Sequence, residues 1–245
     1  MKIKGSVHCL FEQSGIFRDE FLKLGIQAND YDISNYFGKT DVIVDLFYEI
    51  EKAYDNIESI FDAMSKKDLI IAFFPCTYFS GISQMGCLLS NLGYVGLEDF
   101  EKVERIMERF EKRHQYLMVL SKLVYIACKR KLRLIIENPY RESYLLYYFM
   151  KSPDYTDFDR AMRGDMFTKP TNYWFFNCHP TNLQTYQRPK RLRKIMSIGN
   201  GRLYKQNGNI ERSLMTSDYA KNFIKDKILG IPGANTQLNI FENQK

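Results

Sequence analysis

The stretch that decides the fold lies near residue 70 and reads Leu69-Ile70-Ile71-Ala72-Phe73-Phe74. Six successive apolar residues are typical of a parallel β-strand whose two faces are both covered by helices. A second apolar run, 132–136, ends on Glu137 and Asn138. We therefore predict an α/β protein with a parallel sheet and helices on both of its faces.

The rest of the chain alternates strand-like apolar runs with helical patterns, as βαβ units do. We expect further strands at 7–11, 26–30, 42–44 and 173–176, and helices at 16–24, 50–64, 97–131 and 216–229. The first half of the longest helix is rich in charge and is expected to be solvated, whereas its second half is expected to face the core.

Length and composition exclude several classes of protein. The 245 residues, 45% hydrophobic and 26% charged, suffice for one large domain with a small appendage. No apolar run approaches the ~18 residues of a membrane span, and the N-terminus is too polar for a secretory signal. The five cysteines lack metal-ligand spacing, which argues against a disulfide scaffold and a zinc site. We expect a cytoplasmic protein without a metal or a membrane partner.

The net charge of +6 is less informative than the placement of the bases. Within 187–212, a single acid, Glu211, accompanies many bases. This segment is either a solvated charged loop or a patch that attracts the phosphates of a polyanion. The candidate phosphate contacts are Arg188, Lys190, Arg191, Arg193 and Lys194.

Three polar clusters follow three of the predicted strands, at the ends where an open parallel sheet binds ligands. The first cluster contains Phe11 and Gly15, and the next strand ends near Asp30 and Asp32. This layout is typical of a nucleotide or adenosyl site, in which an acid takes the ribose hydroxyls. An ordinary turn between a strand and a helix would have the same appearance.

The other two clusters carry candidate catalytic groups. Cys76 directly follows Pro75 at the end of a strand, where a lowered thiol pKa would make it a nucleophile. A lone cysteine can equally be a small buried hydrophobic residue. Glu137 ends a largely apolar strand, and a buried carboxylate is costly unless it is paired or protonated. It is therefore either a structural cap of backbone amides or a proton donor to a ring nitrogen.

Together the three clusters resemble the DNA (cytosine-5) methyltransferase family in their order and spacing. The resemblance rests on 11–17, on the 68–80 stretch that contains Pro-Cys and Phe-Ser, and on Glu-Asn-Pro at 137–139. It covers residues 7–139. The 169–174 run is similar to a segment of compact, phage-type members, and 212–223 resembles the closing helix of the family.

The chain departs from the family pattern at several places. Gln13 stands where the family has a glycine, and Phe74 stands where a small residue or proline is usual. The run 187–191 matches the arginine motif of the family only in part, and the large target-recognition domain is missing.

The resemblance implies a Rossmann-like, class I fold that transfers a methyl group from S-adenosylmethionine to C5 of a cytosine flipped out of DNA. Cys76 would attack C6, and Glu137, with Asn138 in the same catalytic motif, would hold and protonate N3. The implied cofactor contacts are Phe11, Gly15, Asp30, Asp32, Asp45 and Pro75. Ser80 joins the five bases above as an implied nucleic-acid contact.

The resemblance also implies a division of the chain into three parts. These are a catalytic, cofactor-binding domain (1–165), a reduced target-recognition or basic region (166–212), and a closing helix with a tail (213–245). RNA as the substrate and the oligomeric state stay open. For Trp174 we expect a position in the core rather than stacking on a base.

Two other functions remain open. Gln13 and the short C-terminal region fit a catalytically degenerate protein of the same fold that binds nucleic acid or a partner. A pyrimidine-nucleotide C5 enzyme that uses a folate would also need a Pro-Cys nucleophile, but it would need no adenosyl crevice.

Overall fold

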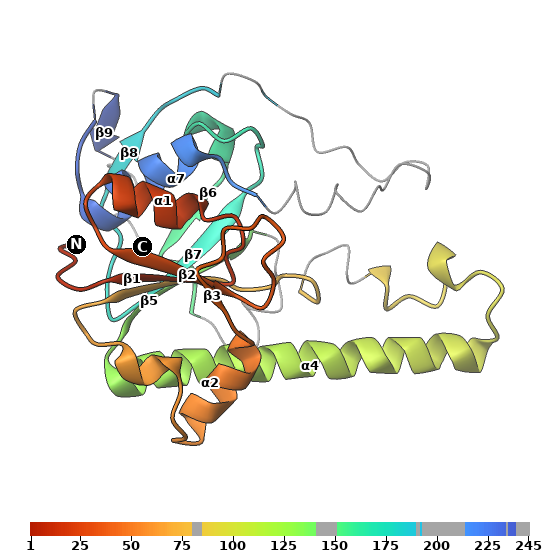
Figure 1. Ribbon diagram of the computed structural model, residues 1–245. Helices are drawn as coiled ribbons and strands as arrows, with labels where there is room; N and C mark the ends of the chain where they lie inside the picture. The colour runs from red at the N-terminus through yellow and green to blue at the C-terminus, as the bar shows by residue number, and fades with distance from the viewer. Residues whose placement is uncertain (80–84, 141–150, 190–191, 193–213, 234, 239–245) are drawn as a thin grey trace.

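The computed structural model describes residues 1–79, 85–140, 151–189, 192, 214–233 and 235–238 (Figure 1). Its main sheet has seven strands in the order β3-β2-β1-β4-β5-β7-β6. Their bounds are β1 Val7–Leu10, β2 Ala28–Asp32, β3 Val42–Ile43, β4 Leu69–Phe73, β5 Arg133–Pro139, β6 Tyr155–Asp157 and β7 Thr171–Phe176. The first five strands run parallel, and β7 is antiparallel to both of its neighbours.

Helices cover both faces of this sheet. On one face pack α2 (Leu46–Tyr54), the 3₁₀ turn η1 (Ile60–Ala63) and the C-terminal half of α4 (Asp99–Arg130). On the other pack α1 (Ile16–Lys23), α7 (Ser217–Phe223) and the π-helical turn η4 (Ile224–Leu229). The prediction of an α/β protein with a mostly parallel, doubly covered sheet is confirmed.

The central strands are buried because their sequences are apolar on both sides. Four of the five residues of β4 and five of the seven of β5 are buried. Alternate side chains of β4 enter the two cores, Ile70 and Ala72 on the α4 side and Leu69 and Ile71 on the α1 side. Trp174 of β7 is fully buried in the α4-side core, so its predicted core position is confirmed.

The structure differs from the sequence predictions in three places. The helix expected at 50–64 is divided, because α2 ends at Tyr54 and Asn56 takes a left-handed conformation (φ 60) before η1 begins. Strand β6 was not expected, since it is only three residues long and has no apolar run. The main sheet also extends beyond residue 165, where we expected the catalytic domain to end, because β7 lies between β5 and β6.

The N-terminal half of α4 extends far beyond the sheet as a single projecting helix (Figure 1). We call this half, 99–113, together with 85–98, the arm. The 85–98 stretch contains η2 (Leu92–Tyr94) and returns beside α4, and Glu98 and Glu101 form a capping box that starts the helix. Most side chains of this half of α4 are exposed, as expected from its charges. A small sheet of β8 (Leu183–Thr185) and β9 (Thr236–Leu238) completes the fold.

None of the helices in the described ranges is long and apolar enough to cross a membrane.

Candidate functional site

The order of the strands fixes where a ligand would bind. The chain winds outward from β1 to β2 and β3 on one side, and continues through β4 and β5 on the other. In doubly wound sheets, ligands bind beyond the carboxyl ends of the strands where the order reverses. That point lies between β1 and β4, which are followed by the Phe11–Gly15 turn and by the loop that carries Cys76.

Cys76 and Glu137 lie at the ends of neighbouring strands. In the pairing of β4 with β5, Phe73 lies opposite Glu137, and Cys76 follows Phe73 by three positions. Paired strands are separated by only about 4.8 Å. The two residues that the sequence assigns to the chemistry are therefore brought to one edge of the sheet.

The backbone around Cys76 is held in place from both sides. Downstream, the amide of Phe79 donates to the carbonyl of Cys76 (3.0 Å), which closes a tight turn. Upstream, Asn138 Nδ2 donates to the carbonyl of Phe74 (2.9 Å), so the end of β5 is tied to the loop after β4. Cys76 itself is half-buried, and none of the five cysteines forms a disulfide.

The phenyl ring of Phe74 anchors the same loop. It is 2% exposed and contacts Phe11 of the neighbouring loop (5.3 Å between ring centroids) in an edge-to-face arrangement. Phe47 of α2 stacks on it at 5.9 Å. A small residue at position 74 would leave this aromatic cluster incomplete.

Glu137 is a buried acid with spare hydrogen-bonding capacity. Only 7% of the surface of Glu137 is exposed to solvent, and its Oε1 has no hydrogen-bond partner among the described residues. Burial raises the pKa of this carboxyl above its ordinary value, although the positive charges of Lys169 and Arg160 oppose the shift. Burial dominates, so the side chain is poised to hold a proton.

Fully buried polar groups support the site behind Glu137. Tyr173, which pairs with Glu137 across β5 and β7, shares a hydrogen bond with the hydroxyl of Tyr219 (2.9 Å). Tyr219 also donates to Asp157 (3.1 Å). Arg160 bonds to Asp165 and lies over the ring of Tyr219, so its guanidinium is fixed in position near Glu137.

The turn after β1 adopts a strained path that brings it close to α1. Phe11 (φ 61) and Gly15 (φ 67) are both left-handed, and Gly15 precedes the first residue of α1. The left-handed φ of Gly15 favours glycine, and a Cβ there would also lie 2.5 Å from the guanidinium of Arg18. Glu12 Oε1 accepts from the amide of Phe17 (3.0 Å) and fastens the turn to the helix.

The structure separates the two candidate ribose acids. Asp30 is fully buried, and its carboxylate already accepts from Arg18 (3.2 Å) and from the amide of Asp41 (2.7 Å). Asp32 stands at the end of β2, level with the turn after β1, and accepts from the amide of Ser34 (2.8 Å) and from Gln13. Burial raises the pKa of both carboxyls, that of Asp30 to about 6.

The remaining predicted residues lie in three kinds of place. Asp45 caps the N-terminus of α2 by accepting from the amides of Phe47 and Tyr48, and Pro75 is half-buried between Phe74 and Cys76. Arg188 is exposed and follows Gln187, which is held by Met162 and Asn222. Outside the described residues lie Ser80, Lys190, Arg191, Arg193 and Lys194.

Several residues around the site were not assigned a role from the sequence. Arg160 and Lys169 act electrostatically on Glu137, and Arg113 of α4 donates to the carbonyl of Tyr78 (2.9 Å). Their contacts span long separations in the chain. The one local signal was the alternation of acids and bases at 157–169, immediately before the apolar β7.

No protein-family model matches this chain, and no curated protein matches it at a significant level.

Proposed function

We propose that this protein is an S-adenosylmethionine-dependent methyltransferase that modifies C5 of cytosine in DNA. The observation that carries the proposal is the pairing of Phe73 with Glu137, which sets a thiol and a protonatable carboxyl at adjacent strand ends. Both groups stand beside the turn after β1, at the point where doubly wound sheets bind nucleotides.

Cys76 acts as the nucleophile in this proposal. Its thiolate sulfur forms a bond to C6 of the ring, and the electrons of the C5–C6 double bond move toward C5 and N3. The target base must leave the DNA stack, because the thiol and the methyl donor approach opposite faces of the ring. The turn closed by Phe79 and the clamp from Asn138 hold the sulfur in a fixed place.

Glu137 supplies the proton that makes this attack favourable. Because burial raises its pKa, this carboxyl holds its proton more readily than an ordinary glutamate and can donate it to N3 as negative charge develops there. The unpartnered Oε1 is then free to accept from the exocyclic amine of the same ring. After methylation, the C5 proton is lost to solvent, the bond between C6 and Cys76 breaks and N3 returns its proton to Glu137, which restores the aromatic ring and the starting state of both side chains.

The groups beside β1 fit an adenosyl cofactor by their chemistry. Asp32 at the end of β2 offers a carboxylate for the ribose hydroxyls, and Gly15 allows a ligand to approach the backbone closely. Phe11 lies in the same turn and packs against Phe74. When bound, S-adenosylmethionine supplies an electrophilic methyl group. We assign Asp32 rather than Asp30 to the ribose, because Asp30 is occupied by Arg18 and Asp41.

The experiment is transfer of a tritiated methyl group from S-adenosylmethionine to DNA by the full chain. Wild type should label DNA, Cys76→Ala should not, and Cys128→Ala, at an exposed cysteine on α4, should label as wild type does. DNA that contains 5-fluorocytosine should remain covalently joined to the peptide that carries Cys76, because fluorine cannot leave C5 as a cation. Equal labelling by wild type and Cys76→Ala, or none by wild type, contradicts the proposal.

A second candidate, a non-catalytic nucleic-acid-binding protein of the same fold, is favoured by one contact. The side chain of Gln13 hydrogen-bonds to Asp32, the acid assigned to the ribose. A ribose hydroxyl would have to displace Gln13 from Asp32, which weakens cofactor binding. Calorimetry with S-adenosylmethionine separates the candidates, since only the enzyme should bind it.

A further inference from the structure

The arm carries a stripe of positive charge along one face of α4. Residues three, four or seven apart lie on the same side of a helix. This spacing places five bases and one tyrosine on one face: Lys102, Arg105, Arg109, Lys112, Arg113 and Tyr116. The neighbouring face carries the acids Glu101, Glu104, Glu108 and Glu111. The charges of this part of the helix therefore nearly cancel in sum, but its bases and its acids lie on separate faces.

The basic stripe forms one wall of a cavity of about 190 Å³. The opposite wall comes from Tyr78, in the turn after Cys76, and from Tyr94 of η2. The lining side chains are Tyr78, Tyr94, Arg105, Glu108, Arg109 and Lys112. Three cations face a single carboxylate, so the cavity is suited to an anion that also accepts hydrogen bonds.

The 85–98 segment of the arm lies against this stripe. A Cβ on Gly86 would come within 2.6 Å of the guanidinium of Arg109, so the backbone of this segment and the Arg109 side chain are close neighbours. The hydroxyl of Tyr94 donates to the carbonyl of Gly86 (2.5 Å), which fixes the loop above the helix. The cavity is therefore built from two segments held together, and is more than a row of surface bases.

This cavity is connected to the loop of the nucleophile. Tyr78 is two residues after Cys76, in the turn that the Phe79 amide closes, so their Cα atoms are at most about 7 Å apart. The buried Arg113 of the same helix donates to the Tyr78 carbonyl, and the ring of Tyr78 packs against Tyr116 at 4.8 Å. The cavity and the candidate nucleophile are therefore joined by one short turn.

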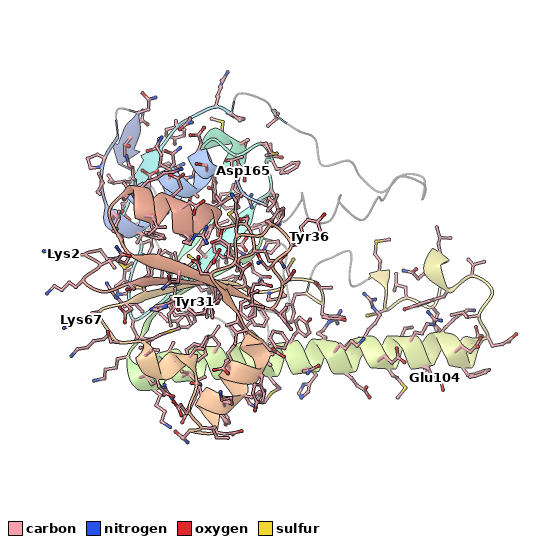
Figure 2. The ribbon with its side chains drawn as sticks, viewed as in Figure 1. Lys2, Tyr31, Tyr36, Lys67, Glu104 and Asp165 are labelled. Carbon is pink, nitrogen blue, oxygen red and sulfur yellow. The ribbon has the colours of Figure 1, made fainter. Side chains whose placement is uncertain are left out.

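The arm projects from the end of the sheet that carries the site. In Figure 2, Lys2 and Lys67, which precede β1 and β4, lie at one end of the molecule. Tyr36, which follows β2, and Glu104 of the arm lie toward the other end. Arg105 and Lys112 are separated by seven residues, or about 10 Å along the helix. That length matches about three nucleotides of a DNA strand, whose phosphates are spaced ~3.4 Å apart along the helix axis.

We infer that the cavity of the arm binds backbone phosphates of the DNA strand that carries the target cytosine. This inference rests on the proposed function, and it places a phosphodiester contact outside the basic segment 187–212. Arg105, Arg109 and Lys112 pair with the phosphates, and the hydroxyl of Tyr78 donates to the phosphate nearest the flipped nucleotide. Such contacts position the strand and carry no base sequence.

The test compares two variants of equal charge in the full chain. Arg105→Ala with Lys112→Ala removes two exposed cations of the cavity, and Lys2→Ala with Lys4→Ala removes two exposed cations at the opposite end. DNA binding is measured by fluorescence anisotropy of a labelled duplex between 50 and 200 mM salt, a range that resolves counterion release. The arm variant should bind about tenfold more weakly, and its slope of log K against log salt should fall by about 1.8.

Further measurements separate failure of this inference from failure of the proposed function. The arm variant should keep the wild-type affinity for S-adenosylmethionine. Equal affinities and slopes for the two variants, together with methyl transfer by wild type, would overturn the phosphate site and leave the function standing. Arm-dependent binding without any methyl transfer would reject the function and keep the site. Stronger arm-dependent binding of RNA of the same sequence would overturn the assignment to DNA.

Discussion

The side-chain amide of Asn138 donates a 2.9 Å hydrogen bond to the carbonyl of Phe74, two residues before the candidate nucleophile. The same amide also donates to the carbonyl of Glu137 (3.0 Å), so one side chain links the loop after β4 to β5. Asn138 is fully buried and is best described as a positioning residue, since its amide contacts the protein backbone.

Replacing Asn138 by Asp should damage activity more than stability. A carboxylate is isosteric with the amide but cannot donate to the two carbonyls, which should cost about 1–3 kcal/mol of unfolding free energy. Because Cys76 loses its fixed position, kcat should fall about a hundredfold while KM for the cofactor stays unchanged. Asn177→Asp is the control, since Asn177 also donates to two backbone carbonyls, far from the site. A similar fall of kcat in that variant would show that general destabilisation is the cause.

Glu137→Gln should make the protein more stable and less active. Its folded-state pKa is raised, so the stability associated with this group is complete below the unfolded pKa and is lost as pH rises through the folded pKa. Glutamine does not ionise, so the Tm advantage of the variant should be absent near pH 4 and should grow toward pH 8. Turnover should fall by about 10²–10⁴. Thermal melts at several pH values test this, with the exposed Glu111→Gln showing no such trend. Near-normal turnover would remove Glu137 from the mechanism.

Gln13→Ala should strengthen cofactor binding. The Gln13 side chain hydrogen-bonds to Asp32, so a ribose hydroxyl must displace it. Removing a competing hydrogen bond of about 0.5–1.5 kcal/mol should tighten the Kd for S-adenosylmethionine by about two- to tenfold in calorimetry. Asp32→Asn should weaken binding in the same assay, whereas tighter binding by Asp32→Asn would show that the acid does not contact the cofactor.

Arg18→Met should destabilise the protein most strongly at high pH. Arg18 pairs with the fully buried Asp30 and with Asp41, and its loss leaves a buried carboxylate without its cation. Above pH 7 the cost should be about 3 kcal/mol. Burial already raises the pKa of Asp30 to about 6, so at pH 5 the carboxyl is protonated and much of the cost disappears. Urea unfolding at pH 5 and pH 8 measures the difference, and adding Asp30→Asn should restore stability at pH 8. Arg130→Met, which breaks the more exposed pair with Asp62, should cost under about 1 kcal/mol.

The sequence predicts the centre of this fold well because the decisive signals are local. The apolar runs of β4 and β5 locate both strands within a few residues, and the groups at their ends, Cys76 and Glu137, follow directly. The break after α2 was missed because it depends on the left-handed conformation of Asn56, which competes with an uninterrupted helical pattern. Positions that depend on long-range contacts were also missed, such as Arg160 near Glu137 and Gln13 on Asp32.

The position of β7 has a consequence for how the protein is made. Strand β7 (Thr171–Phe176) lies beside β5, and α7 then covers it through the stacking of Phe223 on Tyr173. The wall behind Glu137 is therefore completed only when Phe223 has been synthesised. At ~5–20 residues per second, a ribosome adds that residue roughly 7–30 s after Cys76. A nascent chain thus carries the Cys76 thiol for many seconds before the residues that bury Glu137 are in place, and chaperones have that interval in which to shield it.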